Sequence, residues 1–341
     1  MGGATSGPSV AQRLLHDASG KARELMVRSP RVRRLVYSVR NRRLFADLAQ
    51  HDRMLADSVR IEAYYDALSA HIRPGDVVVD LGTGSGVLGF FAARLGAARV
   101  HAIEHGPIIE AAQAVALANG IDNVVFHRVH SSDFELPERA DVILHEQIGE
   151  ALFDERVVEN VAELRDRILK PGGRIFPAHL RLFIEPVEVR ADTRAPFAWE
   201  QELHGIDFRA LEQFGRTQPS SYRQPRFRPF PFERFLCEPA PVVEVDLHHA
   251  NPGELPTEIS YRREVVADGM LDGLCVYFAA GFDPERWFTS SPAAPPTSWG
   301  SPLLRVEQRS VKAGDIIEVT VSAVDLAYPA NWTWNVDVTA G

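Results

Sequence analysis

The sequence contains little cysteine. Only Cys237 and Cys275 occur among its 341 residues, too few for the disulfide framework of a small secreted domain or for a cysteine metal site. We therefore expect no metal and a reducing, cytoplasmic setting. Long apolar runs are also missing, since no segment approaches the roughly 18 consecutive apolar residues of a membrane span. Repeats and low-complexity segments are absent too, which leaves a globular chain long enough for about two domains.

The net charge of −9 is unevenly distributed. Residues 1–43 hold ten Lys or Arg against two acids, a charge of +8, so the rest of the chain carries −17. An acidic body attracts cationic substrates through its summed field. In the basic segment, apolar residues at helical spacing predict helices on both sides of Ser29-Pro30. Its arginines either contact an acidic partner or form a solvated helix face; we favour the second, so nucleic acid is not an expected partner.

A glycine-rich stretch stands at the centre of the chain's organisation. Three valines and Asp80 precede Gly82-Thr83-Gly84-Ser85-Gly86, and an apolar helical segment follows. This pattern predicts a buried strand, a tight turn and a helix, with backbone that can approach a ligand closely. The spacing differs from the G-x-G-x-x-G of dinucleotide-binding proteins. About twenty residues later Glu104 ends a second short strand, where a carboxylate can hold a ribose diol.

Turn and acid together resemble the S-adenosylmethionine (SAM) loop of class I methyltransferases. The resemblance implies SAM as the cofactor, held by Asp80, Gly82, Gly84 and Glu104. A third predicted strand, 123–129, is followed by Ser131-Ser132-Asp133. In methyltransferases of this class an acid at this point accepts a hydrogen bond from the adenine amino group. Asp133 is the nearest candidate, although Ser132 aligns about as well.

The predicted fourth strand, 141–144, leads into a loop with two glutamates nine residues apart, Glu146 and Glu155. A hairpin of this length can return both carboxylates to one point at the carboxyl end of the sheet. Together with Gly149, Leu152 and Phe153, the loop resembles the double-glutamate loop of protein arginine methyltransferases. The resemblance implies that Glu146 and Glu155 are catalytic.

A carboxylate pair suits a guanidinium for a chemical reason. Arginine stays protonated and its charge is delocalised, so its terminal nitrogens are poor nucleophiles. Two carboxylates can orient the group and draw positive charge away from one nitrogen, and they favour the charge that arrives with the methyl group. We expect Glu146 mainly to bind and orient, and Glu155 to receive the proton that leaves.

Two flanking segments extend the resemblance. Residues 51–60 resemble the helix that this family folds over SAM, which implies that Arg60 pairs with the methionyl carboxylate, that His51 lies near the cofactor, and that Met54 packs beside the target nitrogen. Trp299 matches the loop that closes the arginine pocket. The family's neighbouring histidine is Ser298 here, so its pairing with Asp57 is lost. Either a serine hydroxyl replaces that contact, or the acceptor site is reshaped.

Three regions follow from these patterns. Residues 1–43 form a basic helical segment, and residues 44–177 form a SAM-binding, Rossmann-like doubly wound domain. Alternating β-type runs make residues 178–341 an antiparallel β-barrel-like substrate domain. Within it, residues from about 197 to 235, including a short predicted helix at 206–214, resemble the arm with which the family dimerises. A homodimer is therefore implied.

The expected function is SAM-dependent N-methylation of a guanidino nitrogen. The acceptor is an arginine in a protein or peptide, or free arginine or another small guanidino compound. One alternative is a small-molecule N- or O-methyltransferase with a reshaped acceptor pocket. Another, of a different class, is a SAM-binding partner protein without catalysis.

Overall fold

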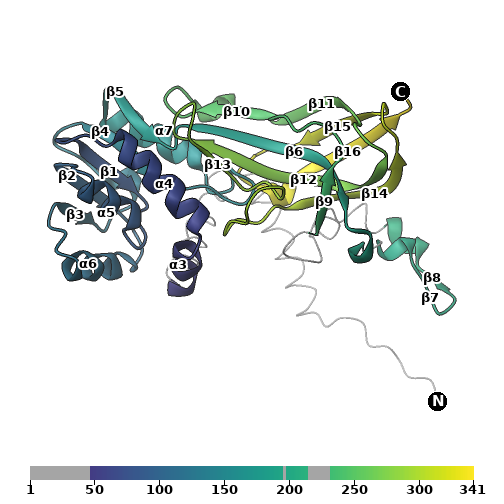
Figure 1. Cartoon of the computed structure of the whole chain (residues 1–341), viewed down its shortest axis with the longest axis horizontal. Helices are drawn as coiled ribbons and strands as arrows, with labels where there is room; N and C mark the ends of the chain where they lie inside the picture. Colours follow the sequence, from purple (N-terminus) through teal and green to yellow (C-terminus); the bar gives the residue numbers. More distant parts are fainter. Residues whose placement is uncertain (1–46, 195–196, 214–230) are drawn as a thin grey trace, which may run out of the picture.

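The structure is a computed structural model, and it describes residues 47–194, 197–213 and 231–341. The basic segment 1–43 and its predicted helices lie outside these residues, as does much of the predicted arm. The described chain forms two sheet-based halves joined end to end (Figure 1).

The first half is a five-stranded parallel sheet in the order β3-β2-β1-β4-β5. Its central strand, β1, is buried along its whole length because helices cover both faces, as its run of valines predicts. The strand order reverses between β1 and β4, which opens a crevice at their carboxyl ends. The predicted doubly wound sheet is therefore confirmed. Its elements are β1 (Val77–Leu81), α5 (Val87–Arg94), β2 (Arg99–Ile103), α6 (Ile109–Ala118), β3 (Val124–His127), β4 (Ala140–His145), α7 (Val157–Ile168) and β5 (Leu169–Phe176).

Two helices, α3 (Leu48–Leu55) and α4 (Ser58–His71), precede this sheet. The sequence predicts one continuous helix over 45–68, and the structure breaks it at Ala56-Asp57. Asp57 causes the break because its Oδ1 accepts a hydrogen bond from the backbone N–H of Arg60 at 3.0 Å, which caps the start of α4. The break turns α3 away from α4, as Figure 1 shows.

The second half, in its described residues, is built on two large antiparallel sheets. One has six strands around the long pair β6 and β12, and the other has three strands in the order β11-β15-β16. The predicted antiparallel domain is confirmed, although the strand pairings of the described residues do not join into one closed barrel. The strands are β6 (His179–Val189), β9 (Phe232–Phe235), β10 (Val243–Asp246), β11 (Glu258–Glu264), β12 (Gly269–Gly281), β13 (Trp287–Thr289), β14 (Leu303–Val311), β15 (Ile316–Ser322) and β16 (Thr333–Thr339).

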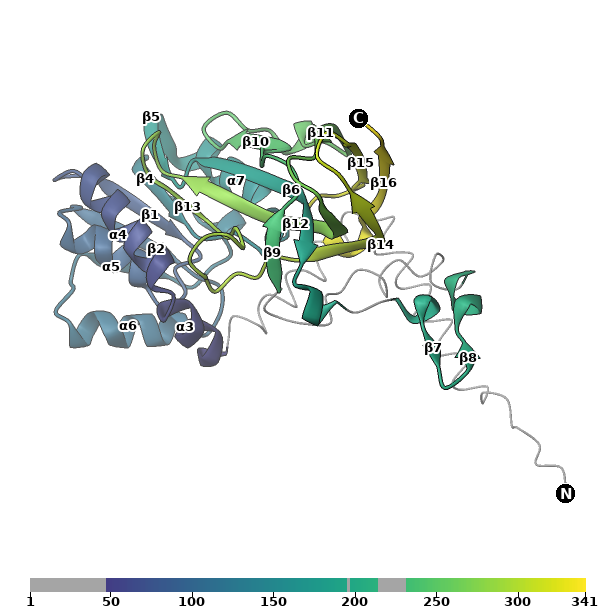
Figure 2. The same cartoon turned by 45° about the vertical axis from the view of Figure 1, so that its right-hand side comes forward.

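A short hairpin projects from this half, away from both large sheets, as two views show (Figures 1 and 2). It pairs β7 (Glu202–Leu203) with β8 (Ile206–Asp207), and a 3-10 turn at Arg209–Leu211 follows. The helix predicted for 206–214 is therefore wrong at its start. His204 and Gly205 have positive φ angles of 51° and 80°, and two such residues make the tight turn that twisted hairpins favour.

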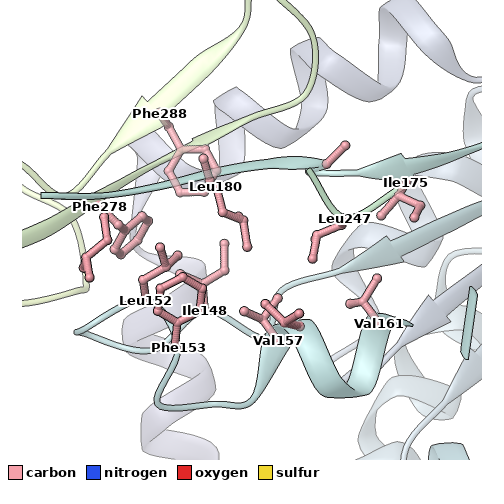
Figure 3. Close-up of a cluster of buried hydrophobic side chains, with 14 of the residues drawn as sticks. Ile148, Leu152, Phe153, Val157, Val161, Ile175, Leu180, Leu247, Phe278 and Phe288 are labelled. Carbon is pink, nitrogen blue, oxygen red and sulfur yellow. The ribbon is translucent and has the colours of Figure 1, made fainter. Parts of the chain in front are cut away.

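The two halves share a core. Figure 3 shows Ile148, Leu152 and Phe153 of the loop after β4 packed with Leu180 and Phe278 of the six-stranded sheet. All five side chains are almost completely buried. The loop that carries both glutamates is thus fixed from beneath by apolar contacts with the second half.

Candidate active site

The carboxyl end of β1 leads into the turn of alternating glycines. Gly82, Gly84 and Gly86 have positive φ angles of 72°, 55° and 93°, a conformation that L side chains rarely adopt. A Cβ atom on Gly84 would lie 2.9 Å from Cε1 of His51 in α3. The turn therefore brings bare backbone to a hollow beside the N-terminus of α5.

Asp80 holds this turn in place. Its Oδ2 accepts hydrogen bonds from the Thr83 hydroxyl at 2.5 Å and from the Gly89 N–H at 3.0 Å. Burial raises the pKa of Asp80 to about 6, and the two hydrogen bonds oppose that rise. Asp80 also lines the hollow, so it both orders the loop and borders the ligand space.

Glu104 lies where two hollows meet. Its buried side chain accepts a hydrogen bond from the Gly106 N–H at 2.6 Å. The hollows have volumes of about 100 Å³ and about 710 Å³, and a carboxylate between them can accept two hydrogen bonds from a diol. Both are lined by Gly82, Glu104, His105 and Gln147.

Helices α3 and α4 cover the smaller hollow. His51, Met54 and Arg60 all line it, and His51 and Arg60 are buried. Arg60 Nη1 lies 2.9 Å from Oε2 of Glu146, and Nη2 donates to the backbone carbonyl of Met54. The arginine predicted to hold the cofactor thus contacts one of the two glutamates.

The double-glutamate loop returns to its starting point through a tight turn. Gly149 pairs with Leu152, which has a φ of 68°. Asp154 Oδ1 accepts a hydrogen bond from the Ala151 N–H at 3.0 Å, and a Cβ on Gly149 would lie 2.0 Å from that oxygen. Only glycine leaves room for this closure, which brings Glu146 and Glu155 into the lining of one hollow.

Burial dominates the electrostatics of this pair. It raises the pKa of Glu146, and the neighbouring Arg60 guanidinium opposes the rise. Burial also raises the pKa of Glu155 well above its usual range. The negative charges of Glu146 and Asp154 nearby add to this rise. Two neighbouring carboxylates with raised pKa values are difficult to ionise at the same time. A bound cation stabilises both in the ionised form, so the pair suits a cation site.

The antiparallel half completes the site. Trp299 Nε1 donates a hydrogen bond to the backbone carbonyl of Ile148 at 2.6 Å, and its ring lies 5.5 Å from the Arg60 guanidinium. Ser298 donates its backbone N–H to Asp57 Oδ2 at 2.5 Å. A contact between this loop and Asp57 therefore exists, made by the serine backbone rather than by its hydroxyl.

Comparison with known proteins identifies the family. The chain is 32% identical over 289 residues to the protein arginine N-methyltransferase 6 of Xenopus laevis, covering 80% of this chain and 84% of that protein. The chain belongs to the protein arginine N-methyltransferase family. A family model described as ribosomal protein L11 methyltransferase (PrmA) matches residues 50–177.

Other members of the arginine methyltransferase family differ in length. The probable histone-arginine methyltransferase 1.3 of Arabidopsis thaliana is 29% identical over 75% of this chain, and the chain spans only about half, 50%, of that protein. The fold agrees with a solved structure, the Trypanosoma brucei PRMT1 enzyme-prozyme heterotetrameric complex with AdoHcy. The TM-score is 0.75 at 23% identity, covering 87% of this chain and 95% of that chain.

Most residues singled out in this arginine methyltransferase family member converge on the hollows, but two do not line them. Asp133 is exposed, while Ser131 and Ser132 line the larger hollow instead. Trp299 lies behind the glutamate loop rather than in the lining. The residues that do line the smaller hollow are His51, Met54, Arg60, Asp80, Gly82, Gly84, Glu104, Glu146 and Glu155.

The sequence did not single out several other residues of the site. Tyr64 lines the smaller hollow and donates its hydroxyl to the His145 carbonyl at 2.9 Å. Gln147 lines both hollows, and Asn160 and Arg156 line the larger one. Only position offered a signal: Gln147 and Arg156 each directly follow one of the two glutamates.

The described residues contain neither a cluster of metal ligands nor a helix that could span a membrane. No group of three or more His, Cys, Asp or Glu side chains is arranged to hold a metal ion. No described helix combines the length and the apolar character that crossing a membrane requires.

Proposed function

We propose that this chain transfers a methyl group from SAM to a guanidino nitrogen of arginine in a protein. One observation carries the proposal: Glu146 and Glu155 line the same hollow as the glycine turn. The ion pair of Arg60 with Glu146 gives further support, since a guanidinium already rests against one member of the carboxylate pair.

The residues around the two hollows fit SAM. Gly82 and Gly84 leave space that side chains would fill, Glu104 offers a carboxylate to a ribose diol, and Arg60 offers a planar fork to a carboxylate. We assign the adenine end to the larger hollow, with Ser132 replacing Asp133 as the nearer side chain. When bound, SAM supplies an electrophilic methyl group on a sulfonium.

The two glutamates perform complementary tasks in this proposal. Glu146 binds and orients the substrate guanidinium, and both carboxylates draw its positive charge away from one nitrogen. Correct orientation matters because the reacting atoms must meet at about 3–3.5 Å. Glu155 then accepts the proton released from the methylated nitrogen, for which its raised pKa is suited.

A protein arginine is the acceptor that the comparisons favour. The Xenopus relative is named a protein arginine N-methyltransferase and the Arabidopsis relative a histone-arginine methyltransferase. The acidic body of the chain also attracts cationic segments.

Labelled SAM tests this function directly. We expect transfer to an arginine-rich peptide and none to the same peptide with lysine at each arginine. Glu146→Gln and Glu155→Gln should each lower kcat by about 100-fold or more, while S-adenosylhomocysteine (SAH) still binds. The exposed Glu62→Gln serves as the control.

Other outcomes distinguish the alternatives. Label on free arginine but not on the peptide would indicate that the acceptor is a small molecule. Label only on other amines or hydroxyls would indicate a reshaped acceptor pocket, and SAH binding without any transfer would indicate a non-catalytic partner. Each of these results contradicts methylation of protein arginine.

We also propose that the chain forms a homodimer in the cytoplasm. The projecting hairpin exposes Leu203 and Ile206, which are 49% and 60% accessible, and a second copy would cover them. The buried free thiols of Cys237 and Cys275 suit a reducing compartment. Light scattering at two protein concentrations would test the dimer, and Leu203→Asp should shift the mass toward one chain.

A further inference from the structure

Asn160 in the first half of α7 connects both ends of the glutamate loop. Its Nδ2 donates one hydrogen bond to Oε1 of Gln147 at 2.7 Å and another to the backbone carbonyl of Glu155 at 3.2 Å. A side-chain amide has two N–H donors, so both are used. The Asn160 amide thus connects Gln147, the neighbour of Glu146, with Glu155.

These two bonds determine which way the Gln147 amide faces. The carbonyl of Glu155 can only accept, so the nitrogen of Asn160 must lie toward it. The second N–H of that nitrogen then points at Gln147, which must answer with its oxygen. The Nε2 of Gln147 is therefore directed to the opposite side, away from Asn160.

That opposite side is the junction of the two hollows. A Cβ on Gly82 would lie 3.1 Å from Gln147 Nε2, so this nitrogen faces the first glycine of the turn. Gln147 and Glu104 both line the two hollows. A donor and an acceptor thus border the same narrow space.

We propose that Gln147 binds the cofactor by donating from Nε2 to a ribose oxygen, and that Asn160 is the positioning residue that orients it. The proposal rests on the proposed function. A ribose hydroxyl that donates to Glu104 still has lone pairs to accept from Gln147. Because Asn160 also holds the Glu155 backbone, cofactor binding and the position of the proton acceptor share one side chain.

SAH binding by the full chain tests the Gln147 donor without requiring turnover. Gln147→Met and Gln147→Glu both remove the donor, and SAH carries no sulfonium charge that could obscure the comparison. We expect Kd for SAH, and for adenosine measured by displacement of SAH, to rise about three- to tenfold. Gln113→Glu, on the exposed face of α6, should bind like the unaltered chain.

A double-mutant cycle tests the role of Asn160. Asn160→Asp cannot donate, so Gln147 must turn its Nε2 toward the new carboxylate and away from the ribose. We expect Asn160→Asp to weaken SAH binding by a similar factor, and Gln147→Met with Asn160→Asp to be no weaker than Gln147→Met alone. Melting curves would confirm that each variant is folded.

Three results would overturn the proposal. The first is an unchanged affinity for SAH in both Gln147 variants, and the second is a weaker affinity for SAH with no change for adenosine. The third is a double variant whose loss of SAH affinity equals the product of the two single losses. Failure of the unaltered chain to bind SAH would instead refute the proposed function, so the two failures can be distinguished.

Discussion

Arg60 and Glu146, 86 residues apart in the chain, form an ion pair in which Nη1 lies 2.9 Å from Oε2. Their side chains are only 5% and 16% exposed, so the pair is held at low dielectric rather than in bulk water. In the proposed function both of these groups have a second partner. The cofactor carboxylate competes for Arg60, and the substrate guanidinium competes for Glu146.

Arg60→Lys should therefore weaken both ligands. Lysine keeps the charge but loses the planar fork that pairs with a carboxylate through two bonds. We expect Kd for SAH to rise about tenfold or more and kcat/KM to fall at least as far. Isothermal titration and peptide methylation would measure these changes. Arg53→Lys, on the exposed side of α3, is the matched control, and equal behaviour of the two variants would contradict the assignment of Arg60.

The contact between Asp57 and Ser298 predicts a difference between two alanine variants. Ser298 donates through its backbone N–H, so Ser298→Ala should change the free energy of unfolding by less than about 0.5 kcal/mol. Asp57→Ala removes both the acceptor for Ser298 and the cap of α4, and should cost about 1–3 kcal/mol. Urea unfolding measures both. Equal losses would mean that the serine hydroxyl makes the important contact.

Glu155 should make the stability of the protein depend on pH. Its pKa in the folded chain is raised, chiefly by burial, so the folded state binds the proton more tightly than the unfolded state. Stability is then lost as pH rises above the ordinary glutamate pKa of about 4.3. Glu155→Gln should raise Tm by about 2 °C or more at pH 8 and have little effect at pH 4. Scanning fluorimetry across this range would measure the change, with Glu62→Gln as control. If Glu155 ionised normally, the difference in Tm between Glu155→Gln and the unaltered chain would not depend on pH.

Trp299 supports the glutamate loop, and this support should be visible in turnover. Trp299→Phe keeps an aromatic ring but removes the hydrogen bond to the Ile148 carbonyl. We expect kcat to fall about three- to tenfold with Kd for SAH unchanged. Trp334→Phe on β16 is the control, because it removes a similar hydrogen bond, from Nε1 to the Arg305 carbonyl at 2.9 Å. If turnover fell in Trp334→Phe but not in Trp299→Phe, Trp299 would have no special role in supporting the glutamate loop.

Local patterns predicted the framework of the molecule well. The valine run before Asp80, the glycines after it and the spacing of Glu146 and Glu155 are features of short segments, and short segments determine strands and turns. The parallel sheet and the antiparallel half follow from such signals. The sequence did not predict the hairpin at 202–207. Its helical pattern is weak there, and the positive φ angles of His204 and Gly205 make a hairpin turn instead.

Contacts between distant segments were harder to predict. Nothing in the sequence indicates that Asn160 reaches back to Gln147, or that the backbone of Ser298 meets Asp57. Such partners depend on how the glutamate loop and the antiparallel half pack together. Asp133 illustrates the same limit, since a shift of one residue after β3 decides whether an acid or Ser132 borders the hollow.

The core that joins the two halves restricts how this chain can be divided. Ile148 and Phe153 pack against Leu180 and Phe278 across the junction, so a fragment cut near residue 177 would expose the apolar side of its glutamate loop to solvent. We therefore expect one calorimetric transition for the pair of sheets, because neither half can unfold without exposing the apolar surface that the other half covers.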